Sequence, residues 1–273
     1  MIEDCSESKI WKYMDLAKFV SLLSTKSLYF ACPFQFHDSA EGSLPKSHME
    51  AWSKLLQQSS LDPMLSLRPH FAAQSSDSLQ QFDGIIKNLA TEMRLARRKA
   101  TLKFGVSCWQ KSEHESEAMW KLYSTSGQGI AIESTIGQLK TSLGDRAGLT
   151  IDSVRYADFE QDPIEKGQKH YGLFMKRNCF EHEKELRATI LLPDSQSFLP
   201  EKDRGILVPC DLDVLINRVH VSPLSEKYVS DAVEDLCLGK AHILQKPVLQ
   251  SQLFHDPGYD IKISTETMQP IGR

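Results

Sequence analysis

Three acidic residues and one arginine alternate along a short stretch of the chain, namely Glu181, Glu183, Glu185 and Arg187. The stretch runs into apolar residues 188–192, which are typical of a strand. If that strand begins near Glu183, side chains two residues apart share one face and lie about 6.6 Å apart. Like charges on one face repel each other, and folding does not require them. We therefore take the stretch as a candidate site, the alternative being a solvated edge with a salt bridge to Arg187.

Other parts of the chain carry side chains that suit the same site. They are the aromatic strand 11–13, a loop that contains Asp38 and Glu41, and the hydroxyl- and glycine-rich turn 123–129. A carboxylate opposite aromatic rings suits a reaction that passes through a sugar cation. The carboxylate stabilises the developing positive charge while the rings stack on a flat leaving base. The alternative is that the aromatic residues belong to the core and the acids are solvated.

Composition and motifs exclude several other classes. The chain has 273 residues, 41% hydrophobic and 25% charged, with a net charge of -4, which predicts a globular protein without a basic field for nucleic acid. Its six cysteines are scattered without a CxxC pair, so we expect a reducing cytoplasm and neither a zinc site nor a disulfide scaffold. HExxH, GxSxG, GxGxxG and a P-loop are all missing, and no metal is predicted. We expect no signal peptide and no membrane association.

Strands and helices are interspersed without a regular βαβ order, which predicts an α+β fold. We expect one domain over residues 1–273, with a mixed, mainly antiparallel central sheet flanked by helices. Residues 46–103 form a helical insertion in it. Strands are expected at 10–14, 28–32, 104–109, 130–132, 150–156, 188–192, 205–210, 218–222 and 246–249. Helices are expected at 16–23, from 77 or 78 into the basic cluster 94–103, and at 115–123, 162–180, 212–216 and 226–238.

An ordered set of short motifs resembles the bacterial domain-of-unknown-function family numbered 2971. None of the motifs is specific alone, and together they span nearly the whole chain except the insertion. The motifs are Trp11-Lys12-Tyr13, Leu28-Tyr29-Phe30, Phe36-x-Asp38-x-x-Glu41-Gly42, Val106-Ser107-Cys108-Trp109, Met119-Trp120-x-x-Tyr123, Gly129-Ile130-Ala131-Ile132, Val154-Arg155-Tyr156, Phe180-x-x-Glu183-x-Glu185-x-Arg187, Val208-Pro209, Leu215-Ile216 and Val221-Ser222-Pro223. The sequence departs from the usual loop of the family at His37 and Ser39.

The order of these motifs is more distantly similar to that of ADP-ribosyltransferase toxins. That resemblance implies NAD as a substrate, whose nicotinamide glycosidic bond is cleaved with a glutamate on a late strand. Carried over by position, Glu185 is the catalytic carboxylate, Glu183 is the second acid, and Tyr13 belongs to the first strand of the site. The implied NAD-binding residues are Lys12, Tyr123, Ser124, Ser126, Arg187, Asp38 and Glu41.

The function predicted on this basis is an NAD-consuming effector of the toxin or anti-phage defence type. Its expected partners are a nucleic-acid or protein acceptor and a neutralising or regulatory protein. Two alternatives stay open. One is a nuclease in which Asp38, Glu41, Glu183 and Glu185 hold magnesium, since carboxylates suit that hard cation. The other is a non-catalytic binder of nucleic acid or protein, in which the basic cluster 94–103 contacts phosphates.

Overall fold

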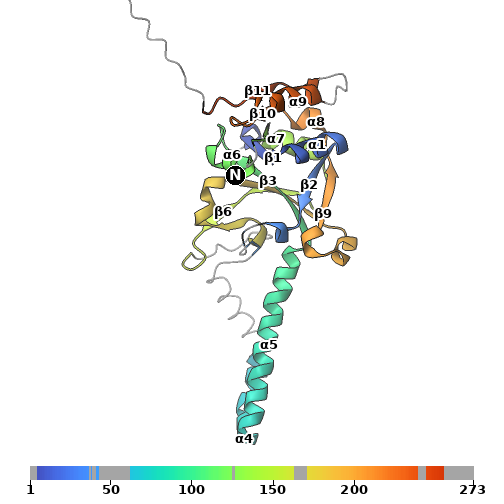
Figure 1. Ribbon diagram of the computed structural model, residues 1–273. Coiled ribbons are helices and arrows are strands. Elements are labelled where there is room, and N and C mark those ends of the chain that lie inside the picture. Colours follow the sequence, from blue (N-terminus) through green and yellow to red (C-terminus); the bar gives the residue numbers. More distant parts are fainter. Residues whose placement is uncertain are drawn as a thin grey trace, which may run out of the picture.

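Among the described residues, nine strands of the body form one mixed, mainly antiparallel sheet flanked by helices, and two more form a small separate sheet, which confirms the predicted α+β fold (Figure 1). The structure is a computed structural model, and it describes residues 5–36, 38, 41–42, 62–124, 127–162, 171–238 and 244–254. The main path of the sheet has the order β11-β10-β4-β1-β3-β2-β9, and β8 and β5 continue from β3. The strands of this sheet are β1 (Lys9–Asp15), β2 (Ser27–Ala31), β3 (Phe104–Lys111), β4 (Gly129–Thr135), β5 (Thr150–Ser153), β8 (Glu185–Leu191), β9 (Gly205–Pro209), β10 (Arg218–Val221) and β11 (Val248–Gln250).

Strand β3 is the centre of the sheet because it pairs with three other strands. On one side it pairs with β8 from Phe104, opposite Leu191, to Gln110, opposite Glu185. On the other side β2 pairs near the start of β3 and β1 pairs near its end. We call the opening between β1 and β2 the fork of the sheet.

The two faces of the sheet differ in chemistry. Because paired residues of neighbouring strands share a face, the register assigns each side chain to one side. The core face carries Ile10, Lys12, Met14, Trp109, Ile130, Ile132, Leu186 and Ala188. The polar face carries Trp11, Tyr13, Cys108, Gln110, Ala131, Glu185 and Arg187. These two names are used below.

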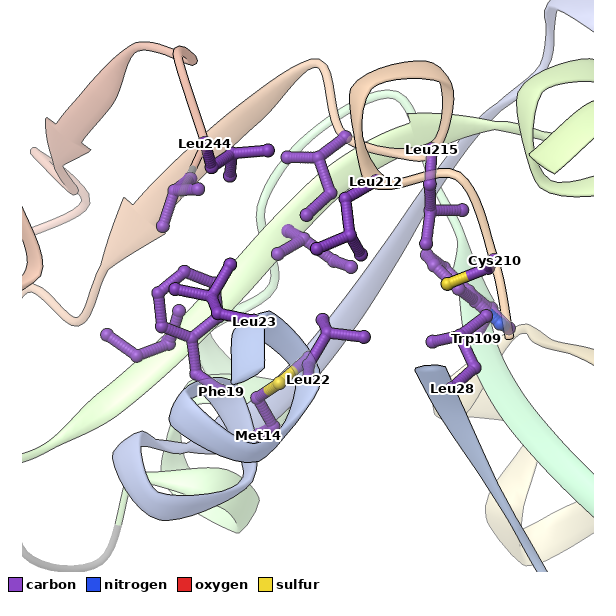
Figure 2. Packing of buried hydrophobic residues seen from close by; sticks show 14 of the residues in the cluster. Met14, Phe19, Leu22, Leu23, Leu28, Trp109, Cys210, Leu212, Leu215 and Leu244 are labelled. Atoms are coloured by element: carbon purple, nitrogen blue, oxygen red, sulfur yellow. The ribbon is translucent and has the colours of Figure 1, made fainter. Parts of the chain in front are cut away.

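Four helices cover the core face and, together with the strands, form the hydrophobic core, part of which Figure 2 shows. They are α1 (Leu16–Thr25), α7 (Ile136–Leu143), α8 (Leu212–Leu215) and α9 (Lys227–Leu238). Helix α1 begins as predicted, since the side chain of Asp15 accepts a hydrogen bond from the backbone N–H of Lys18. It buries Phe19, Leu22 and Leu23 against the sheet. Helix α6 (Glu117–Tyr123) packs on the polar face, where Trp120 contacts Tyr13.

The described part of the helical insertion projects from the body as a long helix with a shorter one beside it (Figure 1). The long helix is α5 (Ser76–Thr101), the shorter one beside it is α4 (Arg68–Gln74), and α3 (Asp62–Leu65) precedes α4. Arg68 pairs with Asp83, and the rings of Phe71 and Phe82 stack at 4.8 Å. The side chains of residues 92–100 lie outside the described part, so the predicted basic cluster is not tested. Gly42 lies against Thr101, since a Cβ on Gly42 would come within 2.9 Å of the Thr101 hydroxyl.

The structure corrects three local expectations. The strand predicted at 150–156 is two strands, β5 and β6 (Arg155–Ala157), that separate at Val154. The predicted helix 162–180 is wrong over its described C-terminal part, which contains a 3-10 turn at Tyr171–Leu173 and the strand β7 (Met175–Arg177) paired with β6. Helix α7 was not predicted, although Thr135 and Gln138 form a capping box at its start.

Neighbouring residues of α1 provide a test of the core. Phe19 is fully buried whereas Val20 is 40% exposed. We expect Phe19→Ala to lower the free energy of unfolding by about 3–5 kcal/mol, because it leaves a cavity under the sheet. Val20→Ala is the control and is expected to change it by less than about 1 kcal/mol. Urea unfolding measures both, and equal effects would contradict this packing.

Candidate functional site

The polar face is organised around Arg187, whose side chain has no exposed surface. Its guanidinium binds Glu185 through two hydrogen bonds, Nε to Oε1 at 2.8 Å and Nη2 to Oε2 at 3.0 Å. It binds Glu41 through two more, of 2.5 and 3.1 Å, and donates a fifth to the carbonyl oxygen of Leu173 at 2.7 Å. A buried guanidinium stays charged and requires such partners. Arg187 therefore joins β8 to the loop before the insertion and to the turn before β7.

A second cation, Lys176, extends this arrangement toward the solvent. Its ammonium group donates to Glu183 Oε2 at 2.6 Å and to Glu185 Oε2 at 3.3 Å. It also lies 4.8 Å from the centre of the Phe180 ring. We call Glu41, Lys176, Glu183, Glu185 and Arg187 the charge network. Three carboxylates face two cations, so the network carries an excess negative charge.

The chain brings Glu183 and Glu185 together by a different route from the one predicted. Glu183 ends a 3-10 helix (Asn178–Glu183), and β8 begins at Glu185. Lys184 between them adopts the left-handed conformation with φ 41°, which is uncommon for a residue other than glycine. This turn, and not strand alternation, lets both carboxylates reach Lys176. Glu181 is exposed and lies outside the charge network.

Two tyrosines lie beside the network. The rings of Tyr13 and Tyr123 stack with their centres 6.5 Å apart. The Tyr13 hydroxyl accepts a hydrogen bond from the backbone N–H of Ser116, so this ring is fixed, whereas Tyr123 is 41% exposed. Partial burial of its hydroxyl, together with the neighbouring Cys108, Glu183 and Glu185, raises the pKa of Tyr123 to about 12. Tyr123 is therefore a neutral aromatic side chain in the field of the acids.

Most of the predicted site residues meet on the polar face. Arg187 contacts Glu185 and Glu41 directly, and Lys176 links Glu183 to Glu185. Asp38 lies next to them through an ion pair of 2.6 Å with Arg177.

Of the two serines predicted to bind NAD, Ser124 does not join this group. Ser124 is buried, donates to Ser222 Oγ at 2.8 Å and accepts from the N–H of Gly129, so it stabilises the turn after α6. Ser126 lies outside the described residues.

Lys12 is placed on the core face, opposite to the side that the prediction required. Its ammonium group enters the fork of the sheet and donates to Ser107 Oγ and to the carbonyl oxygen of Cys108, both at 3.0 Å. It also lies 5.4 Å from the Trp109 ring. Burial lowers the pKa of Lys12, although the neighbouring Cys108 and Glu185 oppose this change. Strand β1 pairs with β3 only at Ile10 and Trp11, so the carbonyl oxygen of Cys108 on β3 has no strand partner on that side among the described residues. Lys12 donates the hydrogen bond that this carbonyl oxygen would otherwise receive from a paired strand.

The site also contains residues to which the sequence assigned no role. Tyr156 accepts a hydrogen bond from the backbone N–H of Glu185 at 2.8 Å and thereby positions the start of β8. Lys176 and Phe180 flank Glu183. Lys176 lies on β7, in a segment that was expected to be helical. No local pattern signals the pairing of Tyr156 with β8.

Comparison of the chain with protein-family models, with curated proteins and with solved structures gave no significant match. The resemblances proposed from the motifs therefore stay predictions. Among the described residues, no cluster of three or more His, Cys, Asp or Glu side chains is arranged to hold a metal ion. None of the described helices is long and apolar enough to cross a membrane.

The charge network makes stability depend on pH. Burial alone would raise the pKa of Glu185, but Arg187 and Lys176 together lower it from 4.5 to about 2. A lowered pKa stabilises the folded state at pH values above 4.5, and this stabilisation is lost as the pH falls toward 2. We expect the loss to reach about 3 kcal/mol for this carboxylate. Urea unfolding at several pH values between 7 and 2.5 measures it.

The variant Glu185→Gln isolates this contribution. It should lower the free energy of unfolding at pH 7, because Arg187 loses a bidentate partner, and it should flatten the decline below pH 4.5. Glu181→Gln, at an exposed position of the same stretch, should keep the wild-type decline. An unchanged decline in Glu185→Gln would show that Glu185 is not the group that titrates.

Proposed function

We propose that the chain is an NAD-consuming, ADP-ribosyltransferase-like effector of the toxin or anti-phage defence type. The observation that carries the proposal is the position of Glu183. Its carboxylate belongs to a buried charge network, yet its side chain is 19% exposed and its charge acts on the exposed Tyr123. An anionic group that meets solvent beside an aromatic ring suits a reaction that passes through a sugar cation. The motif order described above supports the same class.

The contacts favour Glu183 over Glu185 as the carboxylate that meets the substrate. Both oxygens of Glu185 are occupied by Arg187, and Oε2 also receives Lys176. Glu183 is held through Oε2 only, by Lys176, in the described part of the chain. We therefore assign Glu183 as the catalytic residue and Glu185 as a positioning residue, which fixes Lys176 and Arg187. This reverses the roles that the motif resemblance implies.

The proposed step breaks the bond between C1′ of the ribose and the ring nitrogen of nicotinamide. The electron pair of this bond leaves with the base, which becomes neutral nicotinamide. Glu183 stabilises the positive charge that develops on the ribose. Water or an acceptor group then attacks C1′ and loses a proton, for which Glu183 is the nearest base. With water, NAD⁺ and H₂O give ADP-ribose, nicotinamide and H⁺.

The two alternatives fit the contacts less well. In a magnesium-dependent nuclease the acids must be free for a cation, yet Asp38, Glu41, Glu183 and Glu185 are paired with Arg177, Arg187 and Lys176. A binder of nucleic acid or protein would use the projecting insertion and does not require a buried network. Both alternatives serve as outcomes of the experiment below.

The first test is release of nicotinamide from NAD by the purified protein, with and without cell extract or nucleic acid as a source of acceptor. We expect wild type to release nicotinamide and Glu183→Gln to reduce the rate by about 100-fold or more, because the cation loses its counter-charge. The matched control Glu181→Gln removes an exposed acid two residues away and should leave the rate unchanged. Circular dichroism checks that each variant is folded.

Two results would contradict the proposal. One is the absence of nicotinamide release by wild type under every acceptor condition, together with magnesium-dependent cleavage of labelled DNA or RNA. The other is full activity of a folded Glu183→Gln variant, which would remove Glu183 from the reaction. Glu185→Gln should also lose activity. Its free energy of unfolding should fall at the same time, and this loss of stability distinguishes a positioning residue from the catalytic Glu183.

The effector role predicts an effect on growth. Expression of the wild-type chain in bacteria should slow growth and lower cellular NAD, because the substrate is consumed. Expression of Glu183→Gln at the same level should restore both growth and NAD. Growth curves and an NAD assay on the same cultures measure this. Slow growth at normal NAD levels would contradict NAD consumption as the cause.

A further inference from the structure

Gln110 is a buried polar residue of the polar face whose side-chain oxygen has no hydrogen-bond partner among the described residues. The residue is 2% exposed, and its Oε1 lacks a partner in the described part of the chain. The register places it between Trp11 on β1 and Glu185 on β8. Gln110 thus lies beside the charge network, on the same side of the sheet.

An unsatisfied buried acceptor is unfavourable in the folded protein, and most buried polar groups avoid this state. The donors nearest in the register are committed elsewhere. The indole N–H of Trp11 donates to the carbonyl oxygen of Ser112 at 2.9 Å. Lys176 and Arg187 direct their N–H groups to the carboxylates of the network and to Leu173. The described residues therefore leave this oxygen open to a donor from outside them.

We propose that Gln110 recognises the carboxamide of the nicotinamide ring by accepting a hydrogen bond from its N–H group. This inference rests on the proposed function and names the group that selects the leaving base. Paired residues of adjacent strands lie about 5 Å apart, so Gln110 is a neighbour of Glu185, which shares Lys176 with Glu183. A ligand whose ribose meets Glu183 therefore has its base close to Gln110.

The chemistry of the surroundings selects a neutral donor. An acceptor oxygen beside a network with excess negative charge repels a carboxylate, so the acid analogue nicotinate should bind poorly. A base that carries an acetyl group in place of the carboxamide has nearly the same shape but lacks the N–H donor. It leaves the oxygen of Gln110 unsatisfied. Nicotinamide, 3-acetylpyridine and nicotinate therefore differ at the one group that Gln110 is proposed to contact.

Tyr123 is the residue that can admit the base. Its ring stacks on Tyr13, and its hydroxyl makes no hydrogen bond within the described chain. Rotation of this half-exposed side chain away from the polar face therefore breaks no hydrogen bond. The base can then replace the stacking of Tyr123 on Tyr13 with its own.

Ligand-detected NMR titrations of wild type and Gln110→Met with the three bases test the inference. We expect wild type to bind nicotinamide about tenfold more tightly than 3-acetylpyridine, which is the effect of one neutral hydrogen bond. Gln110→Met keeps the volume of the side chain and removes the acceptor. The affinity for nicotinamide should therefore fall to that for 3-acetylpyridine, and the affinity for 3-acetylpyridine should not change. The melting temperature of the ligand-free variant should rise by a few degrees, because the unsatisfied oxygen is gone.

A partnered glutamine provides the matched control. Gln250 on β11 donates from its side-chain amide to the carbonyl oxygen of Ser222 at 2.5 Å. Gln250→Met should therefore lower the melting temperature and leave the affinities for all three bases unchanged.

The outcomes separate this inference from the proposed function. Equal affinities of wild type for nicotinamide and 3-acetylpyridine, or equal losses of both in Gln110→Met, overturn the role of Gln110, as does a wild-type chain that binds neither base. Selective binding that depends on Gln110, without release of nicotinamide from NAD, supports the role of Gln110 and contradicts the proposed catalysis. A third outcome is that wild type releases nicotinamide from NAD faster than it releases the base from the 3-acetylpyridine analogue of NAD, and that Gln110→Met leaves the ratio of these two rates unchanged. This outcome overturns the role of Gln110 but leaves the proposed function standing.

Discussion

The guanidinium of Arg187 has no exposed surface, so its charge and its N–H groups need partners inside the protein. Three separate parts of the chain supply them. Glu185, Glu41 and the carbonyl oxygen of Leu173 all converge on it. Buried ion networks of this kind seldom increase stability over apolar packing of the same volume. A core of apolar residues would close this face of the sheet equally well. The network is therefore better explained by what it positions, namely Lys176 and the partly exposed Glu183.

The division of the sheet into two faces explains how the fold tolerates this cost. The core face receives α1, α7, α8 and α9 and carries the larger, continuous hydrophobic core. The polar face is then available for charged and unsatisfied groups. Lys12 illustrates the division, because this lysine on the core face of β1 donates its hydrogen bonds within the fork and donates none to the carboxylates of the charge network in the described part of the chain.

Much of the fold was predictable from the sequence because its signals are local. Short apolar runs identified β1, β2, β3 and β4, and the predicted helix start at residue 16 is that of α1. The candidate acids were also found by local pattern. What the sequence did not reveal depends on distant pairing. Both faces of β1 are buried, so alternation could not show that Lys12 and Tyr13 serve opposite sides. The left-handed turn at Lys184 and the pairing of Tyr156 with Glu185 likewise have no local signature.

The contact between Gly42 and Thr101 has a consequence for how the chain is built. The helices α4 and α5 lie in the chain between Gly42 and Thr101, which are in contact. The segment therefore leaves and re-enters the body at one place, as a short connecting loop would. The entropy of closing a loop grows only slowly with its length. Segments that leave and re-enter a fold at one place are those that a lineage can lengthen, exchange or lose without rebuilding the core. The projecting helices can thus diverge in sequence while the strands that carry the charge network stay the same.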